Sequence, residues 1–165
     1  MKSLIILCLL TACATTPKPP SDRFEGSGIR TTQPKGYERT CDQHPTQEFC
    51  RAELEAVNRH FNAMPYKLEA IDTWMPITKA GGDCDSYATA KYNRLVELGW
   101  PKSALRLATC CVNFKTRESH AVLLVELGGV TLVMDNRFPD LWTPAETGYK
   151  FDKIQIPGTQ NWEGA

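Results

Sequence analysis

The sequence predicts an α+β domain in which helices come first and an antiparallel sheet follows. Two stretches with apolar residues at helical spacing precede three β-rich stretches, and Gly128-Gly129 alone separates the last two of these. Two-residue turns of this kind join antiparallel strands. The chain has 165 residues, of which 42% are hydrophobic, and this is enough for one domain with one core. We therefore expect N-terminal helices packed on one face of an antiparallel sheet.

The first 12 residues have the pattern of a bacterial lipoprotein signal peptide. Residues 1–2 are a short basic start, and residues 3–10 form an apolar run that is too short to cross a bilayer as a helix. Residues 10–13 (Leu-Thr-Ala-Cys) resemble a lipobox, which implies cleavage before Cys13 and acylation of its thiol and new amino group. Several acyl chains on one residue suffice for stable anchoring. The alternative is an ordinary secretory signal in which Cys13 is incidental.

Residues 13–40 are expected to tether a globular domain, residues 41–165, to the membrane. The tether is rich in Thr, Pro, Lys, Gly, Ser and Arg and has few large apolar residues, which is typical of a flexible linker. Ala14, and not Asp, follows the lipidated cysteine. By resemblance to other lipoproteins, this implies the periplasmic face of the outer membrane if the host is Gram-negative.

Export would permit disulfide bonds. Cys41 and Cys50 are close in sequence and lie outside the segment that carries the candidate chemistry, so we expect a disulfide between them. Two free thiols are the alternative. Cys110 and Cys111 are adjacent on an expected strand and point to opposite faces, which disfavours a bond between them. The sequence has no C-x-x-C motif and only three histidines, so a structural zinc site is not expected.

The charge composition gives no sign of a nucleic-acid partner. Lys+Arg and Asp+Glu each number 19, so the formal net charge is zero. The sequence contains neither a basic run nor a basic stripe interleaved with aromatic residues. We therefore expect no nucleic acid among the partners.

Two helices are expected before the sheet. Residues 46–64 carry apolar side chains at helical spacing, and residues 84–98 place positions 84, 87, 88, 91, 95 and 98 near one face. Gly99 then occupies a position typical of a helix end, and Pro101 leads the chain away. Residues 65–80 contain two prolines and are expected to form a loop with a short helical turn.

Four stretches are expected to be strands, namely residues 105–114, 119–127, 130–136 and 149–156, the last as an edge strand.

The expected hairpin brings a histidine and a carboxylate together. If residues 128–129 form the turn, Asp135 faces Val122, and Val122 shares a face with His120. His120 and Asp135 are then diagonal neighbours within about 7–8 Å, which side chains can bridge. A slip of one residue in the register would move them to opposite faces of the sheet.

Cys84 supplies the third group of a possible catalytic triad. It opens the second expected helix, where free N–H groups and the helix dipole favour a thiolate. His120 can take the thiol proton, and Asp135 can orient that histidine. The residues therefore predict a cysteine nucleophile before any family is considered.

The stretch between residues 54 and 136 resembles the bacterial transglutaminase-like cysteine proteinases, typified by LapG-type periplasmic proteases. The resemblance covers about half the chain and implies a papain-like or transglutaminase-like core. By position, Cys84 would be the nucleophile, His120 the base and later the acid, and Asp135 the orienting carboxylate. The matching motifs are Ala-Val-Asn at 56–58, Phe-Asn at 61–62, Gly-Gly-Asp-Cys-Asp-Ser-Tyr-Ala at 81–88, Ala-Lys-Tyr at 90–92, Leu-Gly at 98–99, Pro101, Leu-Arg-Leu at 105–107, Ser-His-Ala-Val-Leu at 119–123 and Val-Met-Asp-Asn at 133–136.

The same resemblance implies a cofactor and a class of substrate. Known members release large surface adhesins by cleavage at a dialanine-type site, and they require Ca²⁺ held partly by acidic residues beside the nucleophile. Here these positions are Asp83 and Asp85. The family usually has Glu at the second position, and Asp85 has a shorter reach. Asp83 could instead cap the helix. The connection between residues 66 and 81 is shorter than in typical members, so adhesin specificity is not carried over.

These observations predict a cell-envelope cysteine peptidase that attacks a protein substrate through a thioester acyl-enzyme. A transglutaminase would use the same triad with an amine acceptor, and a peptidoglycan endopeptidase would use it on the cell wall. A non-catalytic lipoprotein that binds an envelope partner is the alternative from another class. The complete set of triad positions argues against it.

Overall fold

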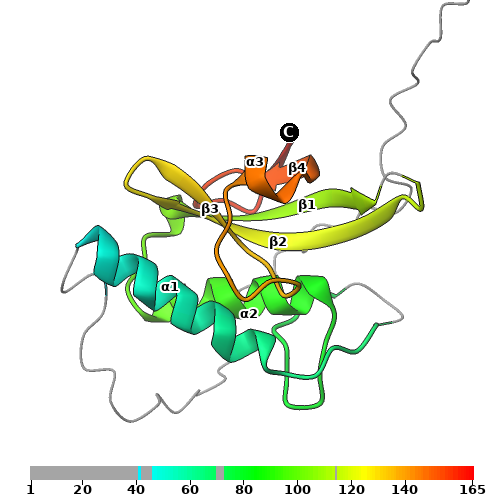
Figure 1. Cartoon of the computed structure of the whole chain (residues 1–165), viewed down its shortest axis with the longest axis horizontal. Coiled ribbons are helices and arrows are strands. Elements are labelled where there is room, and N and C mark those ends of the chain that lie inside the picture. Colours follow the sequence, from blue (N-terminus) through cyan, green and yellow to red (C-terminus); the bar gives the residue numbers. More distant parts are fainter. Residues whose placement is uncertain (1–40, 42–45, 70–72, 114) are drawn as a thin grey trace, which may run out of the picture.

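The computed structural model describes residues 41, 46–69, 73–113 and 115–165. The expected signal peptide, the lipidated Cys13 and the tether lie outside these residues. The predicted α+β class is confirmed, because two helices lie against one face of an antiparallel sheet (Figure 1). None of the described helices is long and apolar enough to span a membrane.

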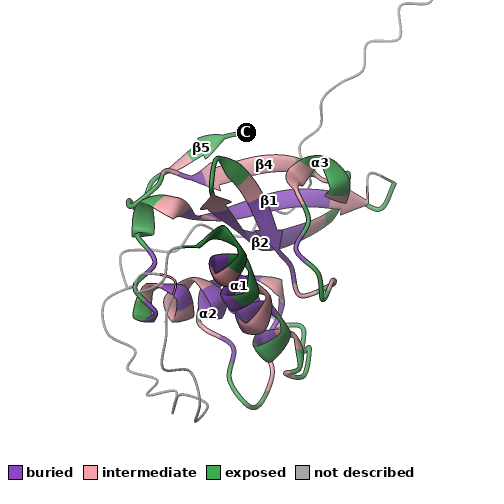
Figure 2. Ribbon diagram, turned by 60° about the vertical axis from the view of Figure 1, so that its left-hand side comes forward, coloured by how far each residue is buried: buried purple, intermediate pink, exposed green. Residues whose placement is uncertain are grey.

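The first helix, α1 (Gln47–Asn62), begins where its N-cap residue satisfies a free backbone donor. The Thr46 hydroxyl accepts a hydrogen bond from the N–H of Phe49 at 3.3 Å. One face of α1 is buried, and it carries Leu54 and Phe61 into the core (Figure 2).

The second helix, α2 (Cys84–Glu97), ends one residue before the predicted boundary. Gly99 follows with φ of 93°, and its N–H donates to the carbonyl of Val96. The N–H of Trp100 donates to the carbonyl of Leu95. This pair of bonds closes many helices that end in glycine, so the sequence signal at Gly99 is confirmed.

The sheet has five strands in the order β3-β2-β1-β4-β5, and the paired strands are antiparallel. A 3₁₀ turn, η1, precedes β1, and a short helix, α3, precedes β4. The elements are η1 (Lys102–Ala104), β1 (Leu105–Asn113), β2 (Glu118–Leu127), β3 (Val130–Met134), α3 (Pro144–Thr147), β4 (Lys150–Gln155) and β5 (Trp162–Gly164).

The predicted hairpin register is confirmed, since Leu127 pairs with Val130 and the pairing continues along β2 and β3. Strand β3 nevertheless ends two residues earlier than predicted. The reason is local: the Asp135 carboxylate accepts a hydrogen bond from the N–H of Arg137 at 2.8 Å, and this turns the chain away from the sheet.

The prediction of an edge strand over residues 149–156 is wrong in its position. β4 covers part of this range but lies between β1 and β5. The short strand β5, which sequence analysis did not predict, forms the edge instead. A three-residue strand carries too little alternation to be recognised in a sequence.

Both faces of the sheet are covered. The face toward α1 and α2 carries Leu107, Leu123 and Met134, which belong to the main core. On the opposite face, a smaller cluster is formed by Ala108, Val122, Leu124 and Val133, with Tyr149, Phe151 and Ile154 packed against it.

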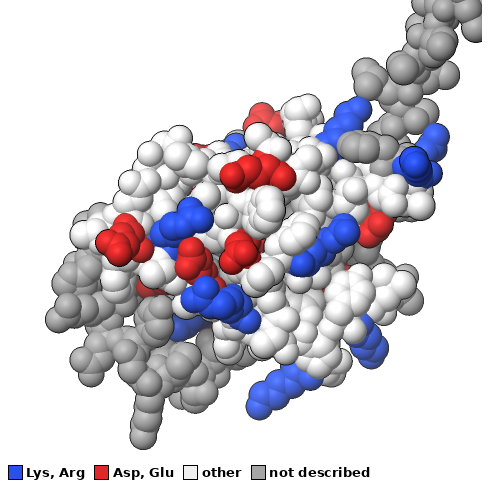
Figure 3. Space-filling model, viewed as in Figure 1, with Lys and Arg blue, Asp and Glu red and all other residues white. Residues whose placement is uncertain are grey.

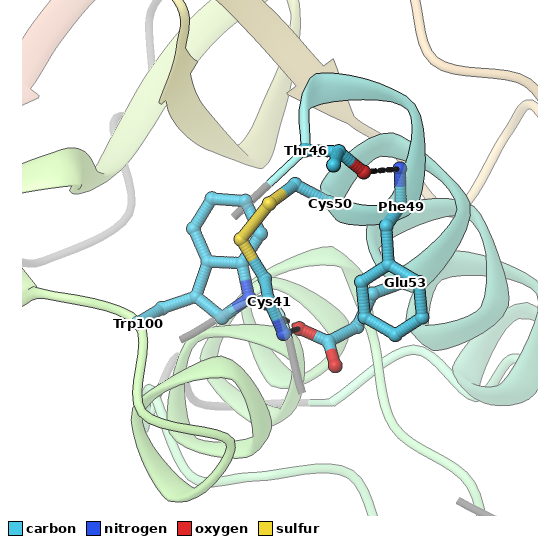
Figure 4. Close-up of a disulfide and its surroundings, with 6 residues drawn as sticks. All are labelled: Cys41, Thr46, Phe49, Cys50, Glu53 and Trp100. Carbon is cyan, nitrogen blue, oxygen red and sulfur yellow. Dashed lines mark hydrogen bonds between the residues drawn. A yellow bond between two sulfur atoms is a disulfide. The ribbon is translucent and has the colours of Figure 1, made fainter. Parts of the chain in front are cut away.

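A disulfide joins Cys41 to Cys50 and attaches the start of the described domain to α1 (Figure 4). The bond lies beside a buried carboxylate on the same helix. Glu53 Oε2 accepts hydrogen bonds from the N–H of Cys41 at 3.3 Å and from the indole N–H of Trp100 at 2.7 Å. The disulfide therefore belongs to a group of contacts that also joins α1 to the segment after α2.

Replacing both Cys41 and Cys50 by Ser should lower the free energy of unfolding by about 2–3 kcal/mol, because the cross-link closes a short loop and restricts the unfolded chain. Urea unfolding of the full chain measures this loss. An unchanged unfolding midpoint in this variant would contradict the prediction.

Charges of both signs are interspersed on the face seen in Figure 3. On α1, Glu55 contacts Arg51 at 3.2 Å and Arg59 at 3.6 Å. Exposed pairs of this kind contribute well under about 1 kcal/mol each. The stability of the domain therefore depends mainly on its core and not on these pairs.

Candidate active site

Cys84 is the first residue of α2 and is only partly exposed. Two glycines before it allow another part of the chain to come close. A Cβ atom on Gly81, whose φ is 98°, would lie 2.7 Å from the carbonyl oxygen of Pro65. The backbone carbonyl of Gly82 accepts a hydrogen bond from the N–H of Lys67 at 2.9 Å. The Gly-Gly pair therefore lets the loop after α1 pack directly against the start of α2.

The helix start does not by itself give Cys84 a low pKa, contrary to the sequence-based expectation. Burial is the main reason that the pKa of the Cys84 thiol is raised to about 12. A hydrogen bond from the backbone N–H of Ala121 lowers it, whereas the neighbouring carboxylates of Asp85 and Asp83 raise it. The thiol therefore needs a basic partner to react near neutral pH.

His120 and Asp135 form a buried pair at the end of the β2–β3 hairpin. His120 Nε2 lies 2.8 Å from Asp135 Oδ1, and the two residues are 5% and 2% exposed. The Asp135 carboxylate also accepts hydrogen bonds from the N–H of Arg137 at 2.8 Å and from the Tyr149 hydroxyl at 2.7 Å. With Nε2 engaged, Nδ1 is the ring nitrogen that can serve a thiol.

The hydrogen bonds to Asp135 keep it ionised. Burial alone would raise the pKa of this carboxyl group, but the bonds from His120, Arg137 and Tyr149 outweigh burial and lower it below the ordinary value. An ionised Asp135 can hold the imidazole in one orientation and stabilise its protonated form.

The structure places Cys84 beside the strand that carries His120, and His120 in turn contacts Asp135. The N–H that hydrogen-bonds to the Cys84 sulfur belongs to Ala121, the residue directly after His120. Helix α2, which begins with Cys84, packs on β2, which carries His120. This arrangement could not follow from sequence spacing, because Cys84 and His120 belong to different elements.

Several residues that support Asp135 were not predicted. Asn62 Nδ2 donates to the backbone carbonyl of Asp135 at 2.8 Å, and Asn58 Nδ2 donates to the carbonyl of Phe138 at 3.0 Å. Two asparagines at i and i+4 on a helix are the available sequence signal for such a role. Tyr149, which lies between α3 and β4, carried no signal of its own.

Asp83 and Asp85 flank the nucleophile and are 3% and 1% exposed. Asp83 occupies the N-cap position of α2, but its side chain makes no cap hydrogen bond, so the capping alternative is wrong. Asp83 Oδ2 instead accepts from the N–H of Glu69 at 3.3 Å, and Asp85 Oδ2 accepts from the N–H of Trp74 at 2.7 Å. Within the described part of the chain, no group of three or more His, Cys, Asp or Glu side chains is placed to hold a metal ion.

A second free thiol lies close to the triad. Cys110 is 1% exposed and pairs with His120 in the β1–β2 ladder. Burial strongly raises the pKa of its thiol. Cys110 is therefore an inert thiol that can serve as an internal reference for the reactivity of Cys84.

A half-buried cysteine at a helix start, beside a strand histidine that is bound to a carboxylate, defines the class of thiol enzymes with a transglutaminase-like core. The sequence comparison agrees with this class. A model of the bacterial transglutaminase-like cysteine proteinases matches residues 46–164, and the chain belongs to this family of enzymes. A comparison with curated proteins found no match.

Solved structures of LapG from Legionella pneumophila share the fold. The calcium-bound form is 24% identical with a TM-score of 0.57, and the match covers 69% of this chain and 72% of that chain. The EGTA-treated form is 22% identical with a TM-score of 0.54, and the match covers 69% and 71% of the two chains. A further LapG structure is 23% identical with a TM-score of 0.53, covering 62% and 63%.

Proposed function

We propose that this enzyme is a cell-envelope peptidase in which Cys84, His120 and Asp135 act as nucleophile, base and orienting carboxylate. The observation that carries the proposal is the 2.8 Å contact between His120 and Asp135, next to a cysteine whose sulfur accepts a hydrogen bond from Ala121. Family membership supports peptide-bond cleavage as the reaction.

In the proposed reaction, His120 Nδ1 takes the proton from the Cys84 thiol, and the sulfur attacks a peptide carbonyl carbon. The N–H of Cys84, one of the unpaired donors at the start of α2, stabilises the oxyanion. His120 then returns the proton to the leaving amine as the C–N bond breaks. Water hydrolyses the thioester with His120 as base, which releases the acid and restores the thiol.

Residues 1–12 are proposed to be a lipoprotein signal peptide, with Cys13 lipidated and residues 13–40 as the tether. The basic start, the apolar run and the Leu-Thr-Ala-Cys sequence support this assignment. The enzyme would then act at the periplasmic face of the outer membrane in a Gram-negative host, on a protein substrate within reach of that surface.

Ca²⁺ is proposed to bind at Asp83 and Asp85. Both carboxylates are buried, and Asp83 Oδ1 accepts no hydrogen bond from the described residues. Carboxylate oxygens are preferred ligands of Ca²⁺, and the LapG structures include a calcium-bound and an EGTA-treated form. When bound, the ion would supply positive charge that offsets the two carboxylates beside Cys84.

Ca²⁺ at about 100 times its Kd should stabilise the fold by about 2.7 kcal/mol. The measurement is the melting temperature of the full chain with Ca²⁺ and with excess EGTA, together with isothermal titration calorimetry. The double variant Asp83→Asn/Asp85→Asn should lose both the heat of Ca²⁺ binding and the rise in melting temperature that Ca²⁺ causes. Asp140→Asn, which removes an exposed carboxylate, should keep them. Equal melting temperatures with Ca²⁺ and EGTA in the wild type would refute the site.

The peptidase proposal is tested by identifying new protein N-termini. Envelope proteins of the host are incubated with the full chain, with Cys84→Ala and with His60→Ala, which changes an exposed histidine. New N-termini should appear with the wild type and His60→Ala and not with Cys84→Ala.

Three other results would each contradict the peptidase proposal. Incorporation of an added amine with release of ammonia, without cleavage, would assign a transglutaminase. Cleaved muropeptides alone would assign a cell-wall endopeptidase. No product, together with an unreactive Cys84, would favour a binding lipoprotein.

A further inference from the structure

The loop after α1 runs beside the residues that lead into the nucleophile. Tyr66 forms a parallel β-bridge with Gly82. Further along the loop, the N–H of Glu69 donates to Asp83 Oδ2 at 3.3 Å. Backbones paired in this way lie about 4.8 Å apart. The loop between these two contacts is therefore fixed alongside the two residues that directly precede Cys84.

The side chain of Tyr66 is exposed, but its ring is supported from one side. Tyr66 is 58% exposed, and its ring stacks on that of Tyr87 with centroids 6.4 Å apart and planes inclined by 16°. Tyr87 is buried, and its hydroxyl donates to the carbonyl of Met64 at 2.6 Å. The Tyr66 ring thus rests on a fixed partner, while more than half of its side chain remains open to a ligand.

The charges around Tyr66 agree with its place beside the nucleophile. Burial is the main cause that raises the pKa of the Tyr66 hydroxyl, and four ionisable groups raise it further, namely Cys84, Asp83, Asp85 and Glu118. The first three lie at the start of α2, and the fourth begins β2. Tyr66 therefore lies near the place where the helix of the nucleophile and the strand of the base both begin.

A protein substrate has to approach this surface in order to react. Attack by Cys84 on a peptide carbonyl places the side chains at the scissile bond close to the sulfur. An aromatic ring can bury apolar surface of such a side chain without a hydrogen-bond partner. Because the Tyr66 ring is already held by Tyr87, little conformational freedom is lost when a ligand packs on it.

We propose that Tyr66 is a specificity-determining residue, whose exposed ring binds a large apolar or aromatic side chain next to the scissile bond of the substrate. The proposal rests on the proposed function, because it assumes that Cys84 is the group that attacks. It names the class of substrate side chain, which the triad by itself does not.

The test compares two alkylating probes that carry the same reacting carbon. Iodoacetamide is small, and N-(2-phenylethyl)iodoacetamide adds an aromatic group that can lie on Tyr66. Each rate at Cys84 in the full chain is divided by the rate with glutathione, which removes the intrinsic reactivity of the probe. On this scale the phenylethyl probe should react about tenfold faster, the lower end of the discrimination that apolar contacts give. Tyr66→Ala should abolish the preference and leave the iodoacetamide rate unchanged.

Two matched variants control for other causes. Tyr66→Phe should keep the preference, because the ring and not the hydroxyl makes the proposed contact. Val130→Ala shortens an exposed apolar side chain beside the turn of the β2–β3 hairpin, and it should also keep the preference. The buried Cys110 should stay unlabelled in each folded variant.

Equal normalised rates for the two probes in the wild type would overturn the proposal, whether or not Tyr66→Ala folds. A preference that survives in folded Tyr66→Ala would also overturn it, as would a stronger preference of the wild type for the cationic N-(2-aminoethyl)iodoacetamide. The ratio of rates does not require substrate cleavage or an activated thiol. A Cys84 that reacts slowly and equally in His120→Ala refutes the triad but leaves this ratio measurable, so the two failures are distinguishable.

Discussion

Alkylation of Cys84 by iodoacetamide near pH 6.5 is expected to be at least about 100-fold slower in His120→Ala than in the wild type. Burial and the adjacent carboxylates raise the pKa of Cys84 to about 12. Without a partner, only about one thiol in 10⁵ would be ionised at pH 7. An imidazolium ion beside the sulfur reverses this, as in cysteines paired with histidine. His120 is therefore expected to supply most of the reactivity of Cys84.

The dependence of the Cys84 alkylation rate on pH should differ between the wild type and His120→Ala. In His120→Ala, the alkylation rate should rise about tenfold per pH unit up to the pKa of the thiol, because only the thiolate reacts. The wild type should react faster and depend much less on pH between pH 6 and 8. Mass spectrometry of the full chain reads Cys84 and the buried Cys110 together, so Cys110 controls for unfolding. Equal slow profiles in both proteins would refute the triad.

Asp135→Asn is expected to lower peptide cleavage by about 10⁴-fold, the loss seen when the carboxylate of a comparable triad is replaced by an amide. The amide can still contact His120, but it cannot stabilise the imidazolium ion. The measurement is kcat/KM on the protein identified by its new N-termini. Tyr149→Phe removes a single hydrogen bond to the same carboxylate, so it should cost much less. A loss below tenfold in Asp135→Asn would contradict the assigned role.

Asp135→Asn should also change how the free energy of unfolding depends on pH. The pKa of Asp135 is lower in the folded protein than in the unfolded chain. The unfolded state therefore binds more protons, and the ionised carboxylate stabilises the fold above the ordinary aspartate pKa of about 3.9. This contribution is lost as the pH falls through the folded pKa. Urea unfolding between pH 3 and 6 should show a shallower dependence in Asp135→Asn.

Local patterns were enough to predict the elements that position the site. Helical spacing and Gly99 located α2 to within one residue at its end, and Gly128-Gly129 predicted the register of the β2–β3 hairpin. Because side chains alternate along a strand, that register was sufficient to place His120 and Asp135 on the same face. These features depend on contacts between residues close in sequence, which is why the sequence alone determined them.

The protonation states of Cys84 and Asp135, and the side chains that hydrogen-bond to Asp135, depend on contacts between distant segments of the chain. Only the tertiary structure decided these contacts. The helix start predicted a low thiol pKa at Cys84, but burial raises it. Tyr149 reaches Asp135 from beyond α3, and Asn62 reaches it from α1. Desolvation and charge interactions depend on which groups surround an atom in space, and chain spacing carries no record of that. The sequence by itself determined which groups could react, and the fold decided the state in which each is held.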